Sequence, residues 1–157
     1  MTATADILDE HAERAAVCEI AFRQFGGVRT FEGPISTVRC HDDNVLVRRR
    51  LSEPGGGGVL VVDGTGSHRV ALVGEIVASL ARDNGWAGLV INGCVRDVAA
   101  IRELDVGIKA IGSTPRPSRK EGAGEVDVPV TFGGVTFYSG DMLFSDDDGV
   151  VTLGASA

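Results

Sequence analysis

The middle of the chain alternates between short apolar runs and amphipathic segments. Residues 58–64 (GVLVVDG) form a continuous apolar run rich in valine, which is typical of a strand covered on both faces. Residues 71–85 carry Leu72, Ile76 and Leu80 at a spacing of four and end in Asn-Gly, which predicts an amphipathic helix. The whole pattern predicts strand 58–64, helix 71–85, strand 86–93, a short helix within 95–105, and strand 106–113.

This β-α-β-α-β order implies parallel strands joined by right-handed crossovers. The flanks, residues 25–40 and 124–153, instead show short alternating strands with glycine turns, and FGGV at 132–135 predicts a hairpin turn. Residues 1–20 predict an N-terminal helix, and the glycine-rich stretch 52–58 predicts a loop. The expected fold class is therefore α/β, with a parallel βαβ centre and flanking mixed β-strands.

Composition narrows the class of protein. The chain has 157 residues, which suits a single domain over residues 1–157, and its net charge of −7 argues against direct nucleic-acid binding. The basic clusters at 48–50 and 116–120 each have acidic neighbours, and the overall charge favours a basic protein partner. No apolar run is long enough for a membrane span, and the N-terminus lacks a secretory signal pattern, so we expect a cytoplasmic protein with free cysteines.

Two short motifs suggest ligand sites but fit them poorly. The turn at 63–69 (DGTGSHR) has Arg69 where a dinucleotide fingerprint needs glycine, so a tight turn is favoured over a phosphate site. A triad of Asp63, Ser67 and His68 is disfavoured because triad members are rarely sequence neighbours. The acidic stretch 145–149 lacks the alternating carboxylates of a calcium loop, which favours a solvated turn.

A more promising group of residues is Glu75 with Arg96 and Asp97. Parallel strands place their carboxyl ends at one edge of the sheet, where open α/β sheets bind ligands. The first turn of the helix that carries Glu75 offers free backbone N–H groups near residues 74–77. An arginine fork can hold a carboxylate, and aspartate can hold a magnesium-like ion, which together suit a small anionic oxo-acid. From the chemistry alone, a surface Arg–Asp pair, with Asp97 as an N-terminal helix charge, remains the favoured alternative.

Several motifs together resemble the RraA-like family, which includes the regulator of ribonuclease activity A and the class II 4-hydroxy-4-methyl-2-oxoglutarate aldolases. Some members have also carried the name of a menaquinone-pathway methyltransferase, but the chain shows no S-adenosylmethionine-binding fingerprint. The resemblance extends from about residue 5 to 153 and is carried by FGG (25–27), GPISTVRC (33–40), GGVLVVDGTGS (57–67), ALVGE (71–75), GLVINGCVRD (88–97), DVGIKAIGSTPRPS (105–118) and FGGVTFYSGDMLFSDDDGVV (132–151). It implies the swivelling β/β/α domain and a ring-shaped homotrimer, with pairing into hexamers left open.

The resemblance also implies a catalytic site. The aldolases share an acidic residue, twenty intervening residues and then Arg-Asp, which corresponds here to Glu75, Arg96 and Asp97. By that resemblance, Arg96 binds the pyruvyl carboxylate and Asp97 anchors Mg²⁺ or Mn²⁺, mostly through water. Backbone groups of Gly74, Glu75, Ile76 and Val77 line the substrate, and Glu75 positions a water or moves a proton. The expected activity is cleavage of 4-hydroxy-4-methyl-2-oxoglutarate to pyruvate, with oxaloacetate decarboxylation through a pyruvate enolate as a side activity.

The chain departs from the aldolases in two ways, and the family also implies an alternative function. Many of the aldolases have a further acidic residue where this chain has Ala100, and the longer ones have a C-terminal extension that reaches a neighbouring subunit. The alternative, also implied by the family, is a non-catalytic protein inhibitor of ribonuclease E that docks on a ribonuclease or helicase. The retained Asp97 favours the enzyme, whereas the short chain and the acidic charge favour the inhibitor.

Overall fold

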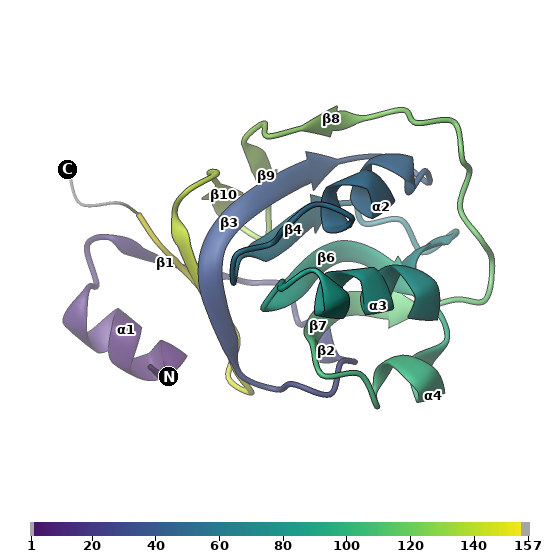
Figure 1. Ribbon diagram of the computed structural model, residues 1–157. Coiled ribbons are helices and arrows are strands. Elements are labelled where there is room, and N and C mark those ends of the chain that lie inside the picture. The colour runs from purple at the N-terminus through teal and green to yellow at the C-terminus, as the bar shows by residue number, and fades with distance from the viewer. Residues whose placement is uncertain (1, 155–157) are drawn as a thin grey trace.

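The computed structural model describes residues 2–154 (Figure 1). Its helices are α1 (Thr4–Glu10), α2 (Val45–Leu51), α3 (Glu75–Asp83) and α4 (Val98–Ile101). Its strands are β1 (Ala15–Cys18), β2 (Arg23–Gln24), β3 (Phe31–Arg39), β4 (Val59–Asp63), β5 (Ala71–Val73), β6 (Gly88–Val95), β7 (Gly107–Ser113), β8 (Glu125–Val126), β9 (Val130–Phe132), β10 (Val135–Phe137), β11 (Met142–Ser145) and β12 (Val150–Leu153).

A curled mixed sheet organises the molecule. Its strand order is β1-β12-β11-β3-β4-β6-β7-β2, with β5 paired to β6 and β8 paired to β3. Strands β3, β4, β6 and β7 are parallel, whereas β11, β12 and β1 join antiparallel. The long strand β3 pairs with β11 through residues 31–34 and with β4 through residues 35–39, which joins the two parts (Figure 1). The predicted α/β class, with a parallel centre and flanking mixed strands, is confirmed.

Strand β4 separates two apolar cores, which explains its unbroken apolar sequence. Leu60 and Val62 pack in the core beneath α2 and α3, which cover one face of the parallel strands (Figure 1). Val59 and Val61 point to the opposite face and pack in a second core with Phe137. Both faces of the strand are therefore buried, as the run of β-branched residues predicts.

The segment after β4 differs from its prediction. Residues 71–73 form strand β5, paired with the end of β6, and α3 begins only at Glu75. Leu72 is consequently a strand residue, and Ile76 is 68% exposed instead of buried in a helical stripe. The reason is tertiary: β6 runs on to Val95, so its last residues offer a free edge with which residues 71–73 pair.

Other elements refine the prediction. Strand β6 continues through Asn92 and Gly93 to Val95, two residues past its predicted end, so Arg96 and Asp97 directly follow the strand. The expected N-terminal helix is limited to α1 and is followed by β1, whereas α2 was not predicted. The predicted hairpin turn is confirmed, because Gly133 and Gly134 have φ angles of 60° and 78° between β9 and β10. Within residues 2–154, no helix is long and apolar enough to cross a membrane.

Candidate functional site

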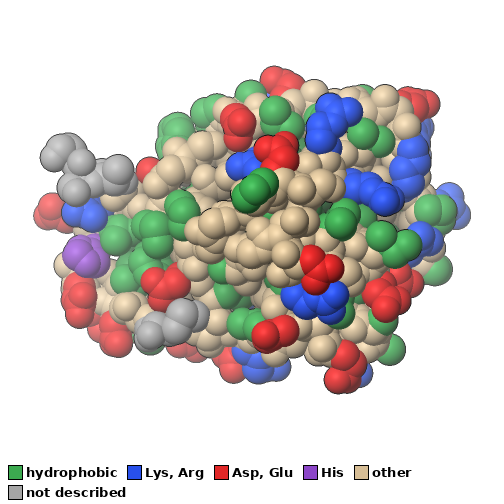
Figure 2. Space-filling model, viewed as in Figure 1, with side chains coloured by type: hydrophobic (Ala, Val, Ile, Leu, Met, Phe, Trp, Pro, Cys, Tyr) green, Lys and Arg blue, Asp and Glu red, His purple; other side chains and the backbone are tan. Residues whose placement is uncertain are grey.

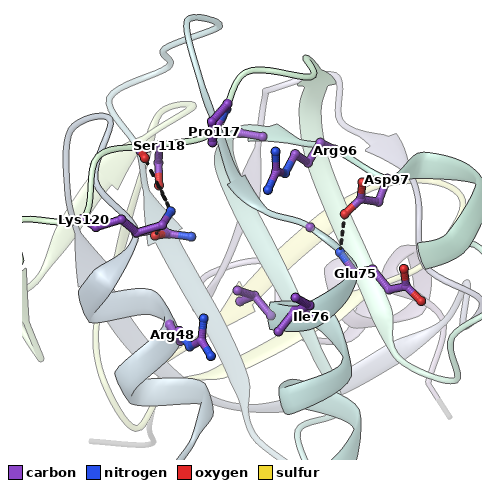
Figure 3. Close-up of a pocket in the computed structure, with 12 residues that line it drawn as sticks. Arg48, Glu75, Ile76, Arg96, Asp97, Pro117, Ser118 and Lys120 are labelled. Atoms are coloured by element: carbon purple, nitrogen blue, oxygen red, sulfur yellow. Dashed lines mark hydrogen bonds between the residues drawn. The ribbon is translucent and has the colours of Figure 1, made fainter.

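A small pocket lies where β5 and β6 end and α3 begins (Figure 3). Its volume is about 100 Å³, well below the roughly 300–1,000 Å³ of sites for drug-sized ligands. All the residues that the sequence singled out for substrate, catalysis or metal line this pocket: Gly74, Glu75, Ile76, Val77, Arg96 and Asp97. The fold therefore brings the two sequence motifs together around one small cavity.

Asp97 connects the two motifs directly. Its carboxylate Oδ2 accepts a hydrogen bond of 2.9 Å from the backbone N–H of Glu75, so it caps α3 although it stands at the start of α4. Asp97 itself has a left-handed backbone, with φ 58° and ψ 42°, a conformation that aspartate adopts more readily than most residues. Among residues 2–154, no ion pair joins Arg96 to Asp97. Of the alternative reached from the chemistry alone, the surface ion pair is therefore absent from the described residues, whereas Asp97 does lie at a helix start, that of α4, and also caps α3.

Gly74 allows this close approach. A Cβ atom at Gly74 would lie 2.7 Å from Asp97 Oδ2, closer than real Cβ atoms come, and 3.2 Å from Arg96 Cγ, which is tighter than most real Cβ contacts. Its φ of −121° is open to any residue, so the requirement for glycine comes from the neighbouring side chains. The sequence Gly-Glu thus positions both the helix start and the carboxylate.

Arg96 is oriented by backbone contacts on both sides. Its N–H donates to Val73 O at 2.9 Å, and its Nη1 lies 3.5 Å from Pro115 O. In Figure 3 the guanidinium points toward the side of the pocket where Lys120 lies, whereas the Glu75 carboxylate extends away from it. The N–H groups of Ile76 and Val77, in the first turn of α3, have no intrahelical acceptor and are available to an anion.

Four further polar residues line the pocket, although the sequence did not indicate them as site residues: Asn44, Arg48, Ser118 and Lys120. Asn44 donates from Nδ2 to Leu72 O at 3.0 Å and accepts at Oδ1 from Lys120 Nζ at 2.9 Å. Burial, together with the nearby Arg96, lowers the pKa of Lys120. The two basic clusters seen in the sequence thus contribute one basic side chain each, Arg48 and Lys120, to the same pocket. Figure 2 shows basic side chains gathered on the side of α2. Their presence was visible in the sequence, but their convergence was not.

One carboxylate of the pocket, that of Asp97, could hold a hard divalent cation that keeps most of its waters. Asp97 Oδ2 is taken by the Glu75 N–H, which leaves Oδ1 as an oxygen ligand. Within the described part of the chain, no group of three or more His, Cys, Asp or Glu side chains could hold a metal. Such a single-carboxylate site suits Mg²⁺ or Mn²⁺ and does not suit zinc, which takes several nitrogen or sulfur ligands.

The other sequence motifs form turns. Asp63 Oδ1 accepts the N–H of Thr65 at 2.9 Å, which closes the tight turn favoured for residues 63–69. His68 contacts the thiol of Cys94 (3.5 Å), so it does not join the disfavoured triad. In the turn 145–149, Asp146 accepts hydrogen bonds from Thr4 instead of forming a calcium loop.

Comparison with known proteins agrees with this fold. The model of the RraA-like family, described as Aldolase/RraA, matches residues 4–152. The chain therefore belongs to the RraA-like family.

Solved structures show the same relationship. A structure described as S-adenosylmethionine:2-dimethylmenaquinone methyltransferase from Geobacillus kaustophilus HTA426 is 46% identical, with a TM-score of 0.95, over 99% of this chain and 96% of that one. The RNA-processing inhibitor RraA from Thermus thermophilis is 44% identical, with a TM-score of 0.95, over 98% and 93%. An RraA protein of Streptomyces coelicolor, described as an unusual member of the RNase ES inhibitor family, is 29% identical, with a TM-score of 0.77, over 96% and 77%. The family thus includes proteins named for different activities.

Proposed function

We propose that this protein is a divalent-metal-dependent aldolase that cleaves 4-hydroxy-4-methyl-2-oxoglutarate to pyruvate and also decarboxylates oxaloacetate. The observation that carries the proposal is the convergence of Arg96, Asp97 and the α3 N-terminus on one small pocket. Arg48 and Lys120 add two further cations to its lining. A pocket of this size and charge suits a small oxo-acid with two carboxylates.

Each residue has a defined role in this proposal. Arg96 binds the carboxylate beside the keto group through its planar fork, which orients the bond to be cleaved. The free N–H groups of Ile76 and Val77 stabilise negative charge on the same end of the substrate. Arg48 and Lys120 attract the second carboxylate. The proposal thus uses both ends of the cationic pocket.

Asp97 would hold Mg²⁺ or Mn²⁺ through Oδ1. When bound, the ion supplies Lewis-acid stabilisation of the negative charge that develops on the keto oxygen. Glu75 is exposed and its carboxylate extends away from the pocket, so its proposed role of moving a proton or ordering a water needs its side chain to turn toward the substrate (Figure 3). No lysine adduct is needed for this chemistry.

The test is pyruvate release from oxaloacetate by purified protein with Mg²⁺ or Mn²⁺, with and without a chelator. We expect metal-dependent turnover above the spontaneous rate and its loss in Asp97→Ala. The control is Asp83→Ala, which removes an exposed carboxylate from the far end of α3 and should leave turnover unchanged. Turnover no faster than the spontaneous reaction, or full metal-dependent activity in Asp97→Ala, would refute the proposal.

A second candidate function is inhibition of RNA processing by protein binding. It is favoured by the 44% identity to the RNA-processing inhibitor RraA over nearly the whole of both chains. The net charge of −7 suits a basic segment of a ribonuclease or helicase. A pull-down against the scaffold region of ribonuclease E tests it, and no binding at micromolar concentration would count against it.

We further propose that the protein assembles as a homotrimer, with pairing into hexamers as the possible next level. Analytical ultracentrifugation tests this directly. A trimer or hexamer mass supports the proposal, whereas a stable monomer or dimer contradicts it.

A further inference from the structure

The β7–β8 loop (residues 114–124) carries Ser118 and Lys120 to the pocket and is held mainly by hydrogen bonds, such as that from Ala71 N–H to Arg116 O at 2.8 Å. Of residues 114–124, only Ser118 is buried. The loop also leaves the sheet edge and crosses to α2 before β8 pairs with β3 (Figure 1). Without an apolar anchor, polar contacts must determine where Lys120 lies.

A buried carboxylate supplies those contacts. Asp43 is 1% exposed and precedes α2. Its Oδ2 accepts the backbone N–H groups of Glu121 at 2.8 Å and Gly122 at 3.0 Å, while Oδ1 accepts the N–H of Val45 at 3.1 Å. Burial opposes ionisation of this carboxyl group, but the backbone hydrogen bonds outweigh burial and lower its pKa. Asp43 is therefore a charged anchor that joins the loop to the start of α2.

Lys120 lies between two anchored residues. On one side, the N–H of Arg119 donates to Asp42 O at 2.7 Å. On the other side, Glu121 is held by Asp43. The Lys120 ammonium group then donates to Asn44 Oδ1 and to Ser118 Oγ, both at 2.9 Å (Figure 3). The position of the ammonium group thus depends on backbone that the Asp43 carboxylate holds in place.

We propose that Asp43 is a positioning residue for the candidate site: its carboxylate holds the β7–β8 loop so that Lys120 faces the pocket. The effect of Asp43 on catalytic turnover rests on the proposed function, whereas the anchoring of the loop does not. Asp43 lies outside the pocket lining, so it acts through Lys120 and not on a ligand.

The anchoring is tested by limited trypsin digestion, because the loop contains cleavable bonds after Arg119 and Lys120. Asp43→Ala should raise the cleavage rate at these bonds about tenfold or more, since it removes charged hydrogen bonds that keep the loop closed. Asp43→Asn, which retains one acceptor oxygen, should give a smaller increase and decides the test if Asp43→Ala does not fold. The matched control is Glu125→Ala, which breaks an exposed ion pair with Arg39 just beyond the loop and should not change the rate.

The positioning role is tested by a double-mutant cycle on oxaloacetate turnover. Asp43→Ala and Lys120→Ala should each lower kcat/KM by a similar factor, and Asp43→Ala should cause little further loss once Lys120 is alanine. Multiplicative losses would overturn the positioning role. Unchanged cleavage at Arg119 and Lys120 in folded Asp43→Ala, or in folded Asp43→Asn if the alanine variant does not fold, would overturn the anchor itself. Because digestion needs no turnover, an inactive wild-type protein would refute the proposed function and leave the anchor to the digestion result.

Discussion

Replacing Gly74 by alanine probes the junction between the two site motifs. The new Cβ would lie 2.7 Å from Asp97 Oδ2, and the backbone angles at Gly74 suit alanine, so the strain falls on the Asp97 carboxylate. That carboxylate must move away from the Glu75 N–H, to which it is hydrogen-bonded at 2.9 Å. The substitution therefore shifts the proposed metal ligand without removing any functional group.

The structure sets the size of two effects. Loss of one charge-assisted hydrogen bond should reduce the free energy of unfolding by about 1–3 kcal/mol. A displacement of about 1 Å at a catalytic group can reduce the rate about 100-fold. We therefore expect kcat/KM for oxaloacetate to fall about 100-fold while the protein stays folded, as followed by pyruvate release and by denaturant unfolding.

Gly154→Ala is the matched control. It makes the same chemical change where the nearest atom, Asp141 Oδ2, would lie 4.0 Å away, so both activity and stability should stay near wild type. If Gly74→Ala kept wild-type kcat/KM, the close packing of Gly74 against Asp97 would have no bearing on catalysis. The proposed role of Asp97 would then be wrong.

Three further predictions follow from other contacts. Arg48→Ala should raise the KM for oxaloacetate about tenfold with little change in kcat, because it removes one cation proposed for the second carboxylate; an unchanged KM would contradict that role. Hydrogen bonds from Thr4 outweigh burial and lower the pKa of Asp146, so Asp146→Asn should cost about 1–2 kcal/mol of unfolding free energy at pH 7. The difference in unfolding free energy between wild type and Asp146→Asn should vanish as the pH falls below 3.8 and through the folded-state pKa of Asp146. A difference that persisted at lower pH would refute this prediction. The three free cysteines are buried, and burial raises the pKa of Cys40 to about 12, so a thiol reagent at pH 8 should label none in the native state and all three after unfolding.

Local patterns predicted the parallel centre of the fold correctly. The apolar run of β4 identified a strand with two buried faces, because each residue from Val59 to Val62 contacts one core or the other. The local pattern at residues 71–73 predicted the wrong element, since the spacing of Leu72, Ile76 and Leu80 fits a helix as well as the strand and helix start that the structure shows. Pairing with the end of β6 decided the outcome, and no local pattern reveals that pairing.

In the candidate site, too, the sequence revealed local features and did not reveal contacts between distant segments. Glu75, Arg96 and Asp97 were singled out because the pattern put them near a helix start and a strand end, although the structure moves these bounds to Glu75 and Val95. The family resemblance supplied the spacing. Arg48 and Lys120 were seen only as members of separate basic clusters. Lys120 reaches the pocket because a carboxylate 77 positions earlier, that of Asp43, holds the backbone of the residue after it. Such long-range contacts depend on the folded chain and leave no periodic signal.

The central claim, that Asp97 and Arg96 form a metal-dependent oxo-acid site, is tested most directly by Mn²⁺ binding. Mn²⁺ would be titrated into wild-type protein and into Asp97→Ala, with and without pyruvate, and free Mn²⁺ followed by electron paramagnetic resonance. We predict binding of Mn²⁺ by wild type that pyruvate tightens, and loss of both effects in Asp97→Ala. Equal Mn²⁺ binding by the two proteins, or no effect of pyruvate on wild type, would contradict the claim.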